Sequence, residues 1–254
     1  MLTPRGLSVA SVLFLAACAH APADPEARAA YERANDPAEP TNRVIFSGNQ
    51  WVDRNALQPV ARAYQNHVPE RVRKSVHNFV SNLKEPGILV NDTLQANFSR
   101  AWVTTQRFVI NTTVGGAGFF DVATDWDRPY HEADFGQTLG VWGAGPGPAV
   151  QLPIFGPSNV RDSIGKIVGF VANPLNFVPG GAGDAVDGRA EMLETTDTLE
   201  KTSLDYYASL RSMQAQRRAK VVEEGKTGGR AKSEPLRIIS PDIPDTDAPA
   251  PAAP

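Results

Sequence analysis

The sequence predicts an all-α domain with an irregular middle that is rich in glycine and proline. Apolar residues recur at helical spacing in the first and last thirds of the chain, and no convincing series of strands and turns is visible. The 21 glycines and 21 prolines interrupt the middle of the 254-residue chain, so long unbroken elements are not expected there. With 41% hydrophobic residues, the chain can bury a sizeable core.

Charge and cysteine content exclude two kinds of site. The formal net charge of −3 argues against nucleic acid as a partner, because the phosphates call for a basic surface. Cys18 is the only cysteine, so the chain can form neither an internal disulfide nor a cysteine-based zinc site.

The N-terminus predicts export and lipidation. Residues 1–17 carry Arg5 and then a short apolar run, which is too short to cross a bilayer and is typical of a signal peptide. The run ends in Leu-Ala-Ala before Cys18 and so resembles a bacterial lipobox, in which the thiol takes a diacylglyceryl group and the new amino terminus an acyl chain such as palmitate. Several acyl chains on one residue give stable anchoring. Ala19 follows in place of the aspartate that favours inner-membrane retention, which indicates the outer membrane; a plain secretory signal with an incidental cysteine is the alternative.

After a tether over residues 18–36, one helical domain is expected over residues 37–224. The clearest helix covers residues 69–83, with Pro69 in its first turn and Pro86 as its stop. Its predicted apolar face consists of residues at helical spacing, namely Val72, Val76, Phe79, Val80 and Leu83.

Two further helices are expected before the irregular middle. One covers residues 87–97, and the next begins after Ser99 as N-cap and runs to Thr113. Trp102, Thr105 and Val109 share a face of the latter, and a glycine pair at 115–116 terminates it.

From residue 135 onward, the amino-acid composition of each segment predicts its structure. Residues 135–161 read as short helical turns and extended pieces joined by tight bends. Ser158 is a candidate cap for a helix through Phe170 that Pro174 ends or bends. The apolar stretch 164–178 suits an interfacial segment. Helices resume from Asp184 with a break at 202–203, and residues 225–254 have the composition of a disordered tail.

No catalytic motif emerges, and we expect neither enzyme activity nor a cofactor or metal. The chain has no GxSxG elbow, HExxH motif or P-loop. An envelope lipase that uses Ser158 or Ser163 remains an alternative, although neither serine lies in a nucleophile elbow. His131 and Asp134 are spaced like a metal pair without a third ligand, and the acidic residues at 121, 125 and 127 lack EF-hand spacing. His77 is interpreted as a helix-surface side chain.

Five ordered blocks of residues resemble the MlaA (VacJ) family of outer-membrane lipoproteins. A weaker match follows at Arg189-Ala190, Leu193, Ser203, Asp205, Tyr207 and Arg211, so that the resemblance covers about residues 35–215. The five blocks are the stronger part. Their members are Asp36-Pro37, Glu39, Asn42-Arg43, Phe46, Asn49 and Asp53; Tyr64, Pro69, Arg71-Val72-Arg73, Asn78-Phe79, Asn82-Leu83, Glu85-Pro86 and Val90-Asn91; Arg107-Phe108, Asn111-Thr112, Gly115, Gly118 and Asp121-Val122-Ala123; Phe135 to Gly140, Gly143 and Gly147-Pro148; and Leu152-Pro153, Gly156-Pro157 and Arg161-Asp162. Gly48 and Ala149 stand where the family usually carries aromatic residues, near segments implicated in its pore and hinge.

The resemblance implies a helical ring in the periplasmic leaflet of the outer membrane, held there by its lipid anchor. In this family, phospholipid mislocalised to the outer leaflet descends through a passive amphipathic channel to a soluble periplasmic carrier, which maintains lipid asymmetry. The resemblance also implies contact with trimeric porins. A structural envelope scaffold without lipid transport is the alternative function.

Ten residues are candidates for the channel or its hinge. On the basis of the resemblance, the first four flank the channel, and the segments 135–140 and 156–162 shape its wall or hinge; the alternative for each residue is ordinary helix packing or turn chemistry. The candidates are Asn42, Arg43, Phe46, Asn49, Phe135, Gly136, Gly140, Gly156, Arg161 and Asp162.

Overall fold

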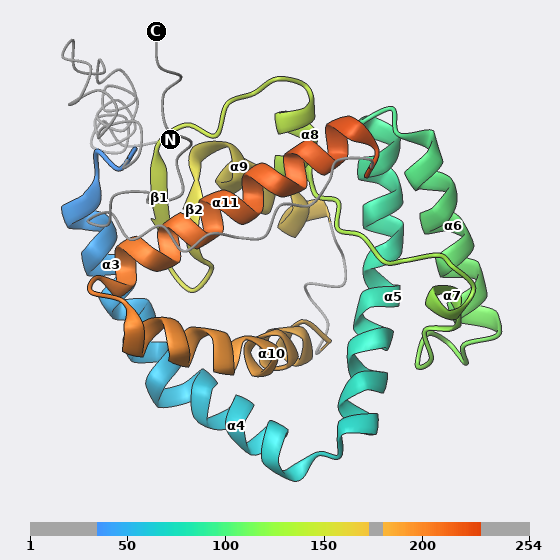
Figure 1. Ribbon diagram of the computed structural model, residues 1–254, viewed down its shortest axis with the longest axis horizontal. Coiled ribbons are helices and arrows are strands. Elements are labelled where there is room, and N and C mark those ends of the chain that lie inside the picture. The colour runs from blue at the N-terminus through green and yellow to red at the C-terminus, as the bar shows by residue number, and fades with distance from the viewer. Residues whose placement is uncertain (1–34, 173–179, 230–254) are drawn as a thin grey trace, which may run out of the picture.

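A computed structural model describes residues 35–172 and 180–229 and confirms an all-α fold with one small sheet. The signal peptide, Cys18, almost all of the tether, Pro174 and the tail from residue 230 lie outside the described residues. The described helices are arranged around a ring: α3 lies on the left, α4 at the bottom, α5 on the right with α6 outside it, and α11 crosses the upper part (Figure 1).

Residues 39–67 form one continuous helical segment, which we call the first helical arm, and its helical register changes once. Helix α3 (Glu39–Val52) has a proline in its first turn, and α4 (Gln58–His67) ends where Val68 becomes extended. Between them, the π-helix η1 (Asp53–Leu57) shifts the register without breaking the arm. Pro69 then begins α5 (Glu70–Leu94) as its N-cap.

The prediction that Pro86 stops a helix is wrong. Helix α5 runs through Pro86 for 25 residues and absorbs the predicted second helix. A proline costs a helix one backbone hydrogen bond and some strain. Here the far half of α5 packs beside α6, and the buried positions Glu85, Ile88 and Asp92 on both sides of the proline hold the helix together.

The next helices use side-chain caps that the sequence only partly indicates. Asn97, not Ser99, caps α6 (Phe98–Thr113), because its side chain accepts a hydrogen bond from the Arg100 amide. Asp121 and Asp134 cap the short helices α7 (Val122–Asp125) and α8 (Phe135–Val141) in the same way.

The extended pieces expected within residues 135–161 form one hairpin. Strand β1 (Ala149–Leu152) pairs antiparallel with β2 (Gly156–Asn159), with Ala149 opposite Asn159 and Leu152 opposite Gly156. Ile154 and Gly156 have positive φ angles of 68° and 72°, which turn the chain tightly. Strands of four residues are too short to show an alternating pattern in the sequence.

Three helices complete the described chain. Asn159, not Ser158, bonds the backbone at the start of α9 (Val160–Ala172), because its side-chain oxygen accepts from the Asp162 amide at 2.9 Å. The predicted break near residue 202 is confirmed between α10 (Gly180–Thr202) and α11 (Tyr206–Thr227), which Asp205 caps.

Helix α11 extends past Gly225, where the sequence predicts the tail to begin. A Cβ at Gly225 would lie 2.8 Å from the Gln95 side chain and 2.9 Å from that of Gln137. This glycine therefore allows α11 to approach its neighbours closely, and the left-handed Gly228 ends the helix.

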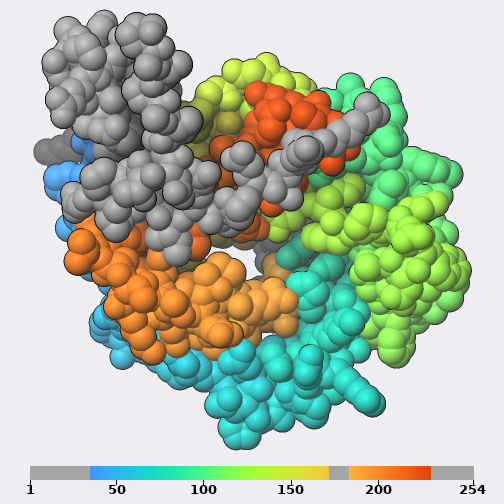
Figure 2. Space-filling model, in the orientation of Figure 1, coloured from blue at the N-terminus to red at the C-terminus, as the bar shows by residue number. Residues whose placement is uncertain are grey.

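The space-filling view has an opening near the middle of the ring, bordered by α10 and α5 (Figure 2). Within the described ranges, no helix combines the length and the apolar character needed to cross a membrane.

Candidate functional site

The two predicted asparagines on α3 hold the hairpin. The Asn42 side chain donates to the Ala149 carbonyl at 3.1 Å and accepts from the Gln151 amide at 2.9 Å. About two helical turns later, Asn49 donates to the Leu152 carbonyl and accepts from the Ile154 amide, both at 2.8 Å. An amide side chain carries both donor and acceptor atoms, as the backbone of a neighbouring strand does. The pair therefore fixes β1 along α3.

Arg43 and Phe46 join the same helix to the start of α11. The Arg43 guanidinium pairs with Asp205 and Glu39 and lies over the Tyr207 ring. The hydrogen bonds from Arg43 hold the pKa of Asp205 below its usual range, although burial opposes this shift. Phe46 contacts the Tyr207 ring edge to face at 5.3 Å. Arg43 and Phe46 thus position the start of α11.

Asp36, the second of the described residues, also connects α3 with α11. Its carboxylate, with no exposed side-chain surface, accepts from Asn42 at 2.6 Å, from Arg211 at 2.7 Å and from the Tyr207 hydroxyl. Burial, followed by the Asp36 carboxylate, raises the pKa of Tyr207, so the phenol stays protonated and donates. The beginning of the domain is therefore locked to both α3 and α11.

Helix α8, which carries the predicted segment 135–140, lies close to α9 and α11. A Cβ at Gly136 would meet the Asp162 side chain at 2.8 Å, and one at Gly140 would meet Val222 at 2.8 Å and Arg161 at 2.9 Å. Phe135 instead contacts Trp142 edge to face at 6.3 Å. The two glycines of this segment allow close helix packing.

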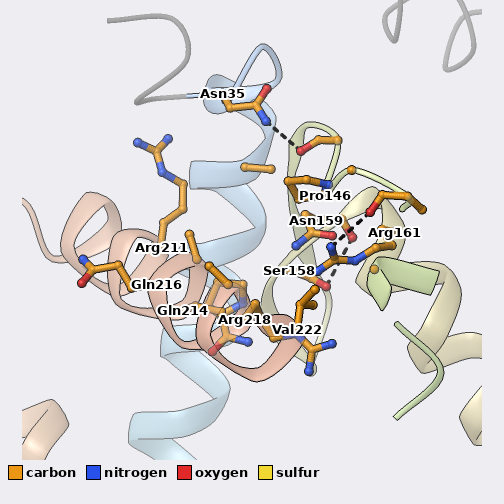
Figure 3. A pocket seen from close by; sticks show the side chains of 18 of the residues that line it. Asn35, Pro146, Ser158, Asn159, Arg161, Arg211, Gln214, Gln216, Arg218 and Val222 are labelled. Carbon is orange, nitrogen blue, oxygen red and sulfur yellow. Dashed lines mark hydrogen bonds between the residues drawn. The ribbon is translucent and has the colours of Figure 1, made fainter. Parts of the chain in front are cut away.

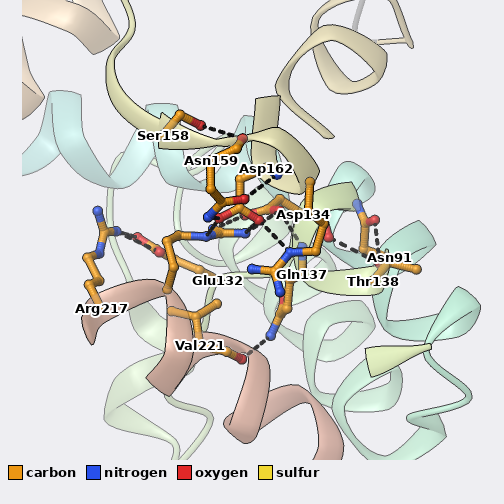
Figure 4. Close-up of polar contacts among 12 residues, drawn as sticks. Asn91, Glu132, Asp134, Gln137, Thr138, Ser158, Asn159, Asp162, Arg217 and Val221 are labelled. Atoms are coloured by element: carbon orange, nitrogen blue, oxygen red, sulfur yellow. Dashed lines mark hydrogen bonds and ion pairs between the residues drawn. The ribbon is translucent and has the colours of Figure 1, made fainter. Parts of the chain in front are cut away.

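A charged network joins these three helices (Figure 4). The Arg218 guanidinium bonds Asp134 at 2.5 and 3.0 Å and Asp162 at 2.9 and 3.1 Å. Asp162 also accepts from Arg161 at 2.8 Å. Burial raises the pKa of both carboxyls, but their hydrogen bonds, including those from Arg218, outweigh it, so both pKa values are lowered.

A cavity of about 600 Å³ lies beside this network, between α11, β2 and the loop 143–147 (Figure 3). Gly140 and Arg161 from the predicted set line it, together with Arg211 and Arg218, whereas Asp162 lies behind Arg218. Its volume is in the range of ligand pockets. Its walls carry three guanidinium groups that acidic partners already neutralise in part.

The predicted site residues therefore form two groups. Asn42, Asn49 and Gly156 belong to the α3–hairpin contact, and Arg43 and Phe46 to its neighbouring junction with α11. The second group surrounds the cavity and its network and comprises Phe135, Gly136, Gly140, Arg161 and Asp162.

Sequence reasoning missed Asp36, Asp134 and Arg218 as members of the site. Asp134 has a local signal, because an aspartate before Phe135 suits an N-cap. Arg218 lies 84 positions after Asp134 and has no local signal, since its role depends on α11 returning to α8.

The interior between α5 and α6 is polar. His131 and Thr104 bond Asp92 at 2.8 and 2.7 Å, and Arg107 bonds Glu85 at 2.7 Å and Asp121 at 3.1 Å. Desolvation raises the pKa of Glu85 to about 7. The fully buried positions on the two helices are mostly polar: Asn82, Glu85, Ile88 and Asp92 on α5, and Arg100, Ala101, Thr104, Arg107 and Asn111 on α6.

This interior accounts for the residues considered for metal binding in the sequence. His131 bonds Asp92, whereas Asp134 caps α8 and bonds Arg218, so the two are used separately. Asp121 bonds Arg107 and caps α7. In the described ranges, neither Ser158 nor Ser163 is hydrogen-bonded to a histidine.

Two parts of the exterior are apolar. The face of α6 predicted to be apolar points outward, with Trp102 and Val109 exposed. All four tryptophans of the chain are between 53% and 68% exposed. On α9, residues at helical spacing form a second exposed apolar stripe: Ile164, Ile167, Val168 and Val171. On α5 and α6, charged side chains are thus buried and large apolar ones exposed, whereas Ala61, Ala190 and Leu193 form an apolar core between α4 and α10.

Comparison with known proteins agrees with the sequence blocks. The profile of the family described as "MlaA lipoprotein" matches residues 34–221. An uncharacterized protein from Rickettsia bellii is 36% identical over 75% of this chain and 78% of the relative. The Escherichia coli K12 protein named "Intermembrane phospholipid transport system lipoprotein MlaA" is 31% identical over 92% of this chain and 94% of the relative.

A solved structure supports the same relationship. It is described as "Structural basis for maintenance of bacterial outer membrane lipid asymmetry", is 32% identical, and superimposes with a TM-score of 0.65 over 74% of this chain and 98% of the other. The sequence profile, the relatives and the shared fold show that this chain belongs to the MlaA lipoprotein family.

Proposed function

We propose that this chain is an outer-membrane lipoprotein that transports phospholipid between the membranes of the cell envelope and thereby maintains lipid asymmetry. The observation that carries the proposal is the pair of exposed apolar faces on α6 and α9, beside the buried charged side chains of α5 and α6. The names of its relatives, which describe intermembrane phospholipid transport and outer-membrane lipid asymmetry, support it.

The apolar exterior suits burial in acyl chains. Exposed apolar surface costs about 25 cal/mol per Å² in water, and lipid removes this cost. Tryptophan is enriched where hydrocarbon meets head groups. The stripe on α9 and the outward face of α6 are two such surfaces, and acylation of Cys18 adds a stable anchor in the periplasmic leaflet.

Passage of a head group requires a channel with polar walls. Irregular backbone and polar side chains are tolerated at membrane depth where they line a polar channel. We propose that the head group descends through the opening bordered by α5 and α10, while acyl chains follow apolar walls. In this proposal the α3–hairpin contact and the α8 network form parts of the wall or hinge.

Net transport of phospholipid in one direction requires a component outside the ring, because a passive channel only equilibrates phospholipid between its two ends. A soluble periplasmic carrier that removes phospholipid supplies it, and trimeric porins hold the ring in place. These partners follow from the family resemblance, and the apolar exterior offers a surface for the porin contact.

The cellular test measures outer-leaflet phospholipid through palmitoylation of lipid A and sensitivity to detergent with EDTA. Deletion of the gene should raise surface phospholipid. The wild type should restore it, and Cys18→Ala, which removes the anchor, should not. Unchanged surface phospholipid after deletion would favour the scaffold alternative.

A second test addresses membrane burial directly. In vesicles whose phospholipids carry bromine on their acyl chains, tryptophan fluorescence of the purified protein should be strongly quenched, because all four rings face outward. The loss of quenched fluorescence in Trp102→Phe reports on the position of α6, and the loss in Trp142→Phe reports on the end of α8. Quenching only by a water-soluble quencher would place the rings in water and contradict the proposal.

A further inference from the structure

Three potential metal ligands meet where α5 faces α10. The His77 Nδ1 atom lies 3.0 Å from Asp187 Oδ2 and 3.0 Å from Glu191 Oε1. The three ligand atoms all lie within 4.8 Å of one another. Asp187 and Glu191 are one helical turn apart on α10, so both carboxylates point from the same face of the helix toward His77.

The Asp187 carboxylate is held in place independently of His77. It is buried, and its second oxygen accepts from the Tyr64 hydroxyl of α4 at 3.2 Å. Metal-binding carboxylates are commonly oriented by such an outer hydrogen bond. The arrangement leaves one oxygen of Asp187 directed at the histidine and the other fixed to a neighbouring helix.

The contacts of His77 suit replacement of a proton by a cation. One imidazole nitrogen lies within 3.0 Å of two carboxylate oxygens, and carboxylate oxygens and an imidazole nitrogen are all lone-pair donors to a metal ion. A divalent ion in that position would accept a lone pair from the imidazole and one from each carboxylate. Two carboxylates would neutralise its charge.

From these contacts we propose that His77, Asp187 and Glu191 form a Zn²⁺ site. One imidazole nitrogen and two carboxylate oxygens are donors that Zn²⁺ accepts, and its tetrahedral preference leaves the fourth position to water. The bound ion joins α5 to α10, and through Tyr64 it also orders α4. The site is independent of the proposed lipid transport, because it needs only these three helices.

The position of the site gives it a structural consequence. Helices α5 and α10 border the central opening (Figure 2), so an ion between them fixes the width of one side of the ring. A second bridge on the same two helices, Lys84 with Asp184 at 2.6 Å, needs no metal and provides a matched comparison. The sequence does not indicate the site, because His77 and Asp187 are 110 residues apart.

The test titrates Zn²⁺ into metal-free full-length protein in detergent by calorimetry and repeats the titration with Co²⁺, read by visible absorption. The wild type should bind one ion per chain. His77→Ala and Glu191→Gln should each weaken binding at least tenfold. His67→Ala and Asp184→Asn, which change a histidine and an aspartate outside the cluster, should bind as the wild type does.

Thermal unfolding gives a second readout. Zn²⁺ should raise the melting temperature of the wild type and of Asp184→Asn, but not that of Glu191→Gln. The Glu191 carboxylate is more than half exposed, so its replacement leaves the fold intact. Absence of Zn²⁺ binding in the wild type, or unchanged affinity in both Glu191→Gln and His77→Ala, would overturn the proposal.

Discussion

Gly136 of α8 and Gly165 of α9 face each other so closely that a Cβ added to Gly165 would lie 2.3 Å from the Gly136 backbone nitrogen. The contact is with backbone, which cannot rotate away. Gly165→Ala should therefore separate the helices and destabilise the protein by about 1–3 kcal/mol, as overpacking does. Chemical denaturation in detergent measures the loss.

Gly169→Ala, on the same helix, is the matched control. A Cβ at Gly169 would have nothing within 4 Å, so the variant should gain the higher helix propensity of alanine, about 1 kcal/mol at most. Equal effects of the two substitutions would show that the close approach of α8 and α9 is unimportant.

Asn49 should control the order of the hairpin. Asn49→Ala removes a donor to the Leu152 carbonyl and an acceptor for the Ile154 amide, and each lost hydrogen bond costs about 0.5–1.5 kcal/mol. Hydrogen exchange should accelerate at the Ile154 amide. Asn55→Ala, which loses only a contact within its own helical arm, should leave this amide protected.

Arg218 and Arg217 are neighbours with different expected effects. Arg218→Met leaves Asp134 and Asp162 without their shared partner and should cost about 3–5 kcal/mol. Arg217→Met breaks a pair with Glu132 that is about half exposed and should cost about 1 kcal/mol or less.

The Arg218 network also has a pH signature. Because the pKa values of Asp134 and Asp162 are lowered, they contribute stability above the ordinary aspartate pKa and lose it as pH falls below about 4. In Arg218→Met this acid-dependent loss should be smaller than in the wild type. Identical acid unfolding curves of the two proteins, measured by circular dichroism, would contradict the assignment.

The contribution of Glu85 to stability should change with pH in the opposite direction. Its pKa is raised to about 7, mainly by desolvation, so the folded state binds more protons than the unfolded state between about 4.5 and 7. Wild-type stability should therefore fall relative to Glu85→Gln as pH rises through this window, by an amount on the order of 3 kcal/mol. Denaturation of both proteins at pH 4.5 and pH 8 measures the difference, and parallel pH profiles would contradict it.

Several features could be predicted from the sequence because their causes are local. Helical spacing and a terminal glycine pair placed the end of α6 at Thr113, and the Thr202 break separates α10 from α11 as expected. The lipidation signal at Cys18 remains a prediction, since it lies outside the described residues. The family blocks were specific because five of them occur in order.

Local patterns failed where neighbouring elements compensate. Pro86 would end an isolated helix, but the contacts of α5 with α6 keep it within one. Gly225 begins a segment whose composition predicts a disordered tail, but this glycine lies in α11, where it allows close contact with α8. In both cases, contacts between helices outweigh a local preference of a few kcal/mol at most.

The sequence by itself determined that the chain is helical and belongs to an outer-membrane lipoprotein family, because helical periodicity and the order of motifs are local properties of the sequence. Only the tertiary structure decided which face of each helix is inside. Periodicity identifies an apolar face but not whether water or lipid surrounds the protein. Packing of α5 against α6 buried Arg107 with Glu85 and left Trp102 exposed. Contacts between helices far apart in the chain joined Arg218 to Asp134 and His77 to Asp187.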